Sequence, residues 1–141
     1  MRSEYQRAKD NAWKWCSKFN RLKDTGKEGY GICPSCGRRI HWTEGDAGHF
    51  KDGRGNAILL YDNGIHLQCK LCNGGLTRGF GSKGVPQIKE NYRKFMLKKY
   101  GEGEIKKIEK LAVQTKKFTV QELKFIAKTY KDKVEFIKSK F

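Results

Sequence analysis

Four cysteines in two C-x-x-C pairs are the residues whose types and spacing most clearly indicate chemistry. Cys33 and Cys36 form the first pair, Cys69 and Cys72 form the second, and residues 37–68 lie between them. Each C-x-x-C turn directs two thiolates toward one point, and two such turns complete the tetrahedral ligand set of zinc. A redox C-x-x-C normally occurs once, beside a βαβ pattern that this sequence lacks. The cysteines therefore predict one structural Zn²⁺ site that clamps both ends of the enclosed segment.

The enclosed segment carries side chains suited to phosphodiester hydrolysis. That reaction needs a base for the attacking water and a cation on the phosphate, which one imidazole and one divalent ion can supply. His49 is the candidate base, and Asn73, directly after the second cysteine pair, is a candidate metal ligand. Asp46 and His66 are further candidate ligands, and the sequence does not decide which of them shares the ion; His66 has the alternative role of supporting the nearby cysteines. Asn63, in the returning loop, is expected to bond a backbone group and hold the imidazole steady.

The charge balance predicts an anionic partner. Lys and Arg total 31 against 15 Asp and Glu, giving a formal net charge of +16. Nucleic acid is the leading candidate, because cationic side chains that bind a polyphosphate release its counterions and so favour association. A ribosome-associated or simply soluble basic protein is the alternative, which charge alone does not exclude. The candidate DNA contacts are Lys51, Arg54, Arg78 and Lys83.

Membrane association is not expected. The longest continuous apolar run is Ala57–Tyr61, far shorter than a membrane span, and the positive charge is spread along the whole chain. The N-terminal residues lack the apolar core of a signal peptide. We therefore expect a cytoplasmic protein, in which paired C-x-x-C units bind metal more often than they form disulfides.

Three segments must position these residues. Residues 1–27 predict an amphipathic helix with Ser3 as its N-cap. Residues 28–84 form a glycine-rich core with short apolar pieces, and residues 85–141 are helical throughout, with the capping-box pattern Thr119-Val120-Gln121-Glu122 opening the last helix.

The extended pieces of the central segment are short. Ile40–Trp42 and Ala47–Phe50 are expected to be the two strands of one hairpin, and Ile58–Tyr61 a third extended piece. A helix is expected to begin beside Asn73, so that the zinc site would fix the position of its side chain.

The order of His49, Asn63 and Asn73 between zinc-binding cysteines resembles the HNH, or ββα-metal, nucleases, in the zinc-clamped variety that includes recombination endonuclease VII. A narrower resemblance is to the NinG/Rap recombination proteins of lambdoid phages, and it rests on Trp42…Asp46-Ala47-Gly48-His49-Phe50 and Asn63-x-x-His66-x-Gln68-Cys69-x-x-Cys72-Asn73. The flanks are similar too, at Arg21-Leu22-Lys23-Asp24, Tyr92-Arg93 and Phe118-Thr119-Val120-Gln121-Glu122-Leu123.

The resemblance implies an α+β fold in which a small zinc-stabilised ββα-metal core is flanked by an N-terminal helix and C-terminal helices. It implies a structure-selective DNA endonuclease that cuts branched recombination intermediates, Holliday junctions or D-loops. His49 would be the general base, Asn63 would orient it, and Asn73, with Asp46 or His66, would hold Mg²⁺ or Mn²⁺. Such a protein would act in a bacterial host, with double-stranded or branched DNA as its partner. We expect a homodimer, because symmetric junction cutting needs two active sites; a recombinase is a further candidate partner.

The sequence departs from the resemblance in two places. After Asn73 it runs Gly-Gly-Leu-Thr-Arg-Gly, where relatives usually carry a Ser-Gly-Asn segment. The other departure is in the metal-binding residues. In endonuclease VII-like proteins an aspartate immediately precedes the catalytic histidine and binds the metal, whereas this chain has Gly48 there. Asp46 or His66 would have to replace that ligand. The competing functions are a non-catalytic zinc-ribbon module that binds nucleic acid and a recombination mediator that pairs strands. The placement of His49 and Asn73 favours the enzyme, because a plain zinc ribbon does not need them.

Overall fold

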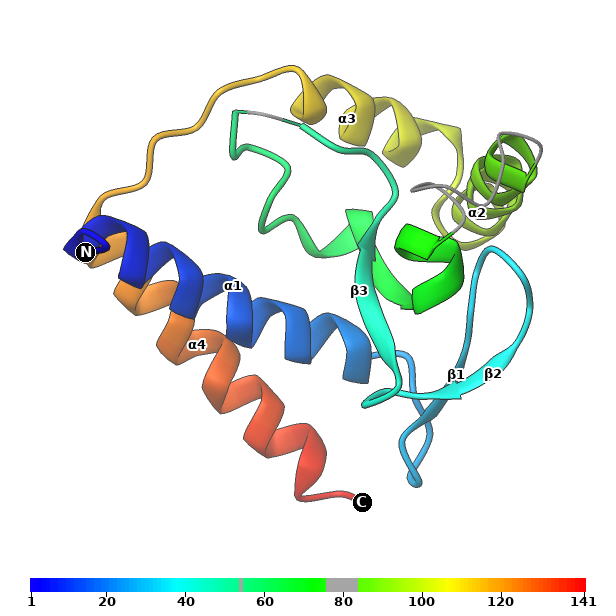
Figure 1. Cartoon of the computed structure of the whole chain (residues 1–141), viewed down its shortest axis with the longest axis horizontal. Coiled ribbons are helices and arrows are strands. Elements are labelled where there is room, and N and C mark those ends of the chain that lie inside the picture. The colour runs from blue at the N-terminus through cyan, green and yellow to red at the C-terminus, as the bar shows by residue number, and fades with distance from the viewer. Residues whose placement is uncertain (54, 76–83) are drawn as a thin grey trace.

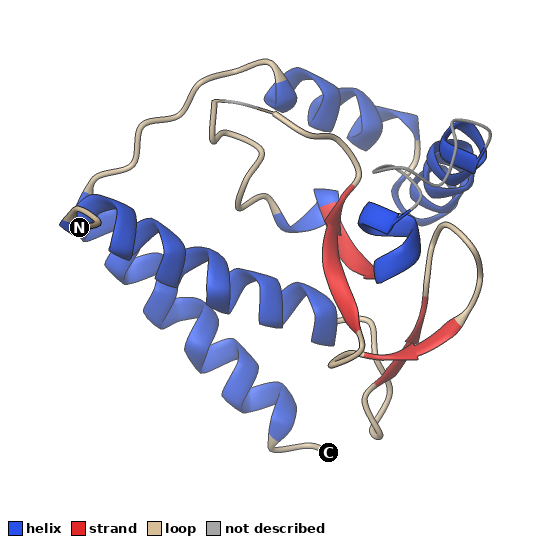
Figure 2. Cartoon of the chain, viewed as in Figure 1, coloured by secondary structure: helices blue, strands red, loops and turns tan. Residues whose placement is uncertain are grey.

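The computed structural model has a mixed α+β architecture, and it describes residues 1–53, 55–75 and 84–141 (Figure 1). Its elements are α1 (Glu4–Leu22), β1 (Tyr30–Ile32), β2 (Arg39–His41), β3 (Gly45–His49), the 3-10 turn η1 (Asp62–Gly64), β4 (Ile65–Cys69), the π-helical turn η2 (Leu71–Gly75), α2 (Gly84–Tyr100), α3 (Glu102–Ala112) and α4 (Val120–Lys138). Figure 2 shows how short the strands are beside the helices. None of the helices in the described ranges is long and apolar enough to cross a membrane.

The first and last helices form where the sequence predicts them and pack against each other. Ser3 caps α1 by accepting a hydrogen bond from the Gln6 amide at 3.1 Å. Thr119 and Glu122 form the predicted capping box at the start of α4. Small buried residues on α1, including Ala12, allow the two helices to approach closely, and Figure 1 shows them side by side at one edge of the molecule.

The predicted strands exist, but the predicted pairing between them is wrong. β2 pairs with β1, in the register Gly31↔Ile40, while β3 pairs with β4, in the register Gly48↔His66; both pairs are antiparallel. Each of the two strand pairs lies beside a cysteine pair. β1 ends at Ile32, directly before Cys33, and β4 ends at Cys69. Apolar periodicity specifies which face of a strand is buried but not which strand lies next to it.

The expected extended piece at Ile58–Tyr61 is also absent. This stretch folds into consecutive turns, with the Leu59 amide bonded to the Asn56 carbonyl at 3.2 Å and the Tyr61 amide to the Ile58 carbonyl at 3.3 Å. Ile58 is buried against α2 and α3. Four apolar residues are equally compatible with a strand and with a buried turn, so the sequence did not distinguish them.

The hairpin of β3 and β4 lies between two helical layers. Ala47 and Ile65 pack with Cys16 of α1 and Tyr130 of α4. On the α2 side, the Tyr92 hydroxyl donates a hydrogen bond to the Gly48 carbonyl at 2.7 Å. The hairpin is therefore supported from both sides, as the position of β3 between α1 and α2 in Figure 1 shows.

Candidate functional site

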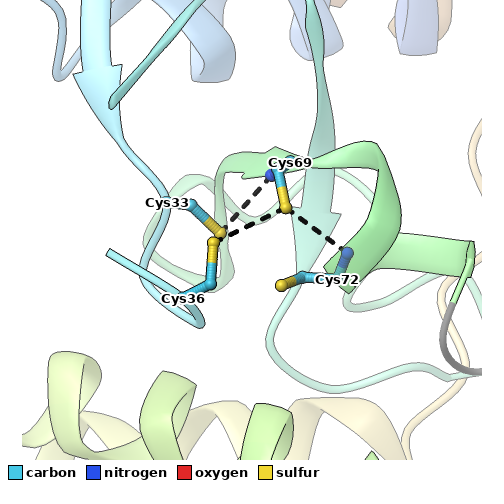
Figure 3. A group of neighbouring side chains, drawn as sticks. All are labelled: Cys33, Cys36, Cys69 and Cys72. Atoms are coloured by element: carbon cyan, nitrogen blue, oxygen red, sulfur yellow. Dashed lines mark hydrogen bonds between the residues drawn. The ribbon is translucent and has the colours of Figure 1, made fainter. Parts of the chain in front are cut away.

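The four paired cysteines converge on one point, as the sequence predicts (Figure 3). The sulfur atoms of Cys33, Cys36, Cys69 and Cys72 all lie within 4.8 Å of one another. A tetrahedral Zn²⁺ site with Zn–S bonds of about 2.3 Å places its sulfurs about 3.8 Å apart, and the Cys36 and Cys69 sulfurs are 3.7 Å apart. These four residues therefore fit a zinc ion.

The backbone around the cysteines favours a bound cation. The Cys69 amide donates to the Cys33 sulfur, and the Cys72 amide donates to the Cys69 sulfur, each at 3.4 Å. Without a metal, burial is the main cause that raises the pKa of Cys33 and of Cys72. A divalent ion offsets that cost, so the thiolate set and the folded hairpin stabilise each other.

Asp46 and Asn73 lie together at the open end of the β3–β4 hairpin. The Asn73 side-chain amide donates to the Asp46 carboxylate at 3.0 Å, and the Lys70 ammonium approaches the other carboxylate oxygen at 2.8 Å. Burial would raise the pKa of Asp46, but the hydrogen bonds from Lys70 and Asn73 outweigh it and hold the pKa below its usual value. Asp46 is therefore an ionised carboxylate beside a carboxamide. The turn η2, which begins within the second cysteine pair and includes Cys72, positions Asn73.

Gly48, the residue directly before His49, is required by packing. A β-carbon at this position would lie 2.0 Å from the Gln68 side-chain oxygen and 3.0 Å from the Gln68 β-carbon. Gln68 is buried, and it donates to the Ser35 hydroxyl at 2.8 Å inside the first cysteine pair. Any side chain at position 48 would displace this link between the hairpin and the cysteines. The acidic residue of the strand is instead Asp46.

His49 ends β3 with one ring nitrogen fixed by the backbone. Its Nε2 lies 3.0 Å from the Leu59 carbonyl oxygen. A carbonyl only accepts hydrogen bonds, so Nε2 carries a proton, and in the neutral form of the ring the lone pair is therefore on Nδ1. Nδ1 makes no hydrogen bond with the part of the chain that the structure describes. Trp13 of α1 stacks on the imidazole with ring centres 5.1 Å apart and an interplanar angle of 19°.

The structure gives Asn63 a different partner from the one expected. Its side-chain amide donates to the Glu104 carboxylate of α3 at 3.1 Å, beside the hydrogen bond from the Tyr61 hydroxyl to the same oxygen. The contact that orients His49 comes from the Leu59 carbonyl. A main-chain oxygen has no signature in the sequence, which is why sequence reasoning assigned this task to Asn63.

His66 is buried on the α2 face of the hairpin, away from solvent. It is 1% exposed, and both ring nitrogens are engaged. The Tyr92 hydroxyl donates to Gly48, so it accepts from Nδ1 of His66 at 3.2 Å, and Nε2 accepts from the Tyr100 hydroxyl at 2.8 Å. Neither nitrogen is available to a metal in this arrangement. Of the two alternatives, Asp46 is the residue that lies beside Asn73, and His66 supports the backbone next to His49.

His66 should make the protein acid-sensitive. Burial lowers its pKa from 6.5 to about 2, and Lys23 and Lys99 add repulsion. The unfolded chain then binds a proton that the folded chain excludes, so this contribution to stability is complete above about pH 6.5 and is lost as the pH falls. Between about pH 7 and about pH 5.5 the free energy of unfolding should fall by about 1 kcal/mol from this group alone. Urea unfolding across this range should show a loss that is about 1 kcal/mol smaller in His66→Gln than in the wild type and in His41→Gln, because other groups, the zinc-binding thiolates among them, still titrate in every variant. Equal losses in all three proteins would contradict the assignment.

A polar pocket of about 400 Å³ surrounds Asp46 and Asn73. Its wall also includes Lys70 and, from α1, Trp13 and Arg21. Trp13 thus contacts both the pocket and the His49 ring. Sequence reasoning missed Trp13, although an aromatic residue off the apolar stripe predicted for this helix was a signal.

His49 and Asp46 lie on the same strand, but in the described structure His49 is not in direct contact with the Asp46–Asn73 pair. Three residues of strand separate the α-carbons of Asp46 and His49 by about 10 Å, and strand alternation starts their side chains toward opposite faces. Of the four predicted DNA contacts, Arg54, Arg78 and Lys83 lie outside the described residues. The fourth, Lys51, is half-buried over the Phe50 ring, with its ammonium 5.3 Å from the ring centre.

The fold and the cysteine cluster define a small α+β protein with a four-cysteine site compatible with zinc. The sequence profile of the family described as Bacteriophage Lambda NinG protein matches residues 2–140. The chain therefore belongs to the NinG family, a phage family related to recombination. Searches of curated proteins and of solved structures give no match.

Proposed function

We propose that this protein is a metal-dependent endonuclease that cuts branched DNA recombination intermediates such as Holliday junctions or D-loops. One observation carries the proposal. The cysteine-clamped hairpin and the turn that follows it bring the Asp46 carboxylate and the Asn73 carboxamide together, and Asp46 lies on the same strand as His49, whose Nε2 is held by the Leu59 carbonyl. A general base and a pair of oxygen donors are the parts that one-metal phosphodiester hydrolysis needs.

Asp46 and Asn73 fit a catalytic Mg²⁺ or Mn²⁺ ion. Both side chains offer hard oxygen atoms, and Mg²⁺ is commonly held by one or two protein ligands, with water and substrate phosphate completing its shell. When bound, the ion would stabilise negative charge on the phosphate. The carboxylate needed for binding is already ionised, because Lys70 and Asn73 lower the pKa of Asp46.

In its neutral form His49 can act as the general base. Nδ1 would take a proton from the attacking water as its oxygen bonds to phosphorus and the bond to the leaving sugar oxygen breaks. The Leu59 carbonyl would steady the imidazolium that results, because it already accepts from Nε2. On this account the scissile phosphate lies between the pocket and the imidazole, next to Trp13.

A second candidate function is a zinc-braced module that binds DNA without cutting it. It is favoured by the contacts that already satisfy the site residues: Lys70 and Asn73 engage the Asp46 carboxylate, and Trp13 covers one face of the His49 ring. Recombination mediation would also fit such a module.

Cutting assays separate the two functions. We expect the protein to cut a four-way junction in Mg²⁺ or Mn²⁺, to cut a linear duplex of the same sequence far more slowly, and to stop when EDTA is added. Zinc content, measured on the EDTA-treated sample, shows whether the structural site was kept. Binding of the junction without cutting in either metal would support the module and overturn the enzyme. The expected homodimer and any recombinase partner stay predictions, which sedimentation and affinity capture would test.

A further inference from the structure

A cluster of cations covers the side of α1 and α4 that leads to the pocket. We call it the cationic face and define it by seven side chains: Lys14, Trp15, Lys18, Arg21, Trp42, Lys131 and Lys138. The α1 side chains are brought together with those of α4 because the two helices pack against each other (Figure 1). Residues 14 to 21 of α1 span roughly 10 Å, the axial length of about three successive phosphates on one DNA strand.

Two tryptophan rings hold these cations in place. Around Trp15, the ammonium groups of Lys18, Lys14 and Lys131 lie 4.7, 5.4 and 5.8 Å from the ring centre. Cations at such distances are attracted to the face of the ring.

The second ring joins the two helices. Over Trp42, the Lys138 ammonium lies 4.9 Å and the Arg21 guanidinium 5.2 Å from the ring centre. Arg21 also donates to the Trp42 carbonyl at 3.1 Å. The cations are therefore held by tryptophan rings and a backbone carbonyl rather than by carboxylates.

Carboxylates do not balance this charge. Among the described residues, none of the five cations of the face has a carboxylate oxygen within 4.0 Å. Lys18 shows the effect: burial lowers its pKa, and Lys14, Lys138 and Arg21 lower it further by repulsion. Like charges gathered in this way favour binding of a polyanion, which relieves the repulsion.

The cationic face is continuous with the candidate site. Arg21 belongs to the face and also lines the pocket that contains Asp46 and Asn73. We propose that the cationic face binds the phosphodiester backbone of one DNA arm and directs its strand into this pocket. The proposal rests on the proposed function for the identity of the polyanion, and it assigns DNA contacts that differ from the predicted ones at Lys51, Arg54, Arg78 and Lys83.

A charge-matched pair of variants tests this inference. The face variant is Lys14→Gln, Lys18→Gln and Lys138→Gln. The control variant removes the same charge from exposed lysines of α3 and the segment after it, Lys106→Gln, Lys110→Gln and Lys117→Gln. Affinity for a four-way junction is measured in EDTA-free buffer with Ca²⁺ over a range of salt. We expect the face variant to lose at least about tenfold in affinity, and the slope of log affinity against log salt to fall by about 2 to 3; the control should stay much closer to wild type.

The possible outcomes distinguish failure of the cationic face from failure of the nuclease proposal. Equal losses in the two variants, or none in either, would overturn the cationic face while leaving the nuclease proposal standing. Selective loss in the face variant with no cutting by the wild type would uphold the face and overturn the nuclease. A wild type that binds no DNA would overturn both. As a second readout that needs no variant, bound junction should protect Lys14, Lys18 and Lys138 from acetylation and leave Lys106, Lys110 and Lys117 reactive; the reverse pattern would contradict the proposal.

Discussion

Replacing His49 with alanine should slow the cutting of a four-way junction by about 10²- to 10⁴-fold, the usual contribution of a general base. The reason is that Nε2 of His49 donates to the Leu59 carbonyl, so that in the neutral ring Nδ1 holds the lone pair and is the group placed to take the proton of the attacking water. Single-turnover cutting in Mg²⁺ measures the effect. Junction affinity should stay within about twofold, because one side chain among the many cations of this chain contributes little to total phosphate binding.

His41 provides the matched control for this variant. It is a half-buried imidazole on β2 whose Nδ1 lies 2.7 Å from the Thr43 hydroxyl. His41→Ala should therefore cut at close to the wild-type rate. Near-normal cutting by a folded His49→Ala protein would show that the base lies elsewhere.

Replacing Cys36 with serine should remove the bound zinc and lower the free energy of unfolding by at least about 3 kcal/mol. Cys36 is exposed, so a serine there would cost within about 0.5 kcal/mol if the side chain had no ligand role. A large loss at an exposed position can arise only through the metal site. Zinc content and urea unfolding, measured on the same samples, test the expectation.

The fifth cysteine, Cys16, is the control for this result. It is fully buried between α1 and the hairpin, and burial raises its pKa to about 12. Cys16→Ala should lose some packing energy and keep one zinc per chain. If Cys36→Ser kept both its zinc and its stability, the four cysteines would not be a metal site.

The sequence predicts those parts of the molecule whose structure depends on local chemistry. The spacing within each C-x-x-C pair dictates where two sulfurs point, so the cysteine cluster was predictable without the fold. Ser3 and Thr119 begin their helices because their side chains satisfy free backbone amides, which is again a local effect.

The parts that the sequence did not predict depend on contacts between distant residues. The pairing of β3 with β4 requires closing the loop from Phe50 to Gly64, which no periodicity specifies. His49 is supported by the Leu59 carbonyl and by the Trp13 ring. A backbone carbonyl has no signature in the sequence, and Trp13 is 36 positions away from His49. The choice between Asp46 and His66 as the residue beside Asn73 likewise depends on which face of the hairpin α2 covers.

The most direct test is a crystal structure of the His49→Ala variant with Mn²⁺ and a branched DNA, with the metals located by anomalous scattering. We expect zinc at the four cysteines and one Mn²⁺ ion bound by Asp46 and Asn73, with a phosphate oxygen on the ion and the phosphorus facing residue 49. Mn²⁺ and phosphate bound away from the β3–β4 hairpin would contradict a shared catalytic centre and leave a zinc-braced DNA-binding protein.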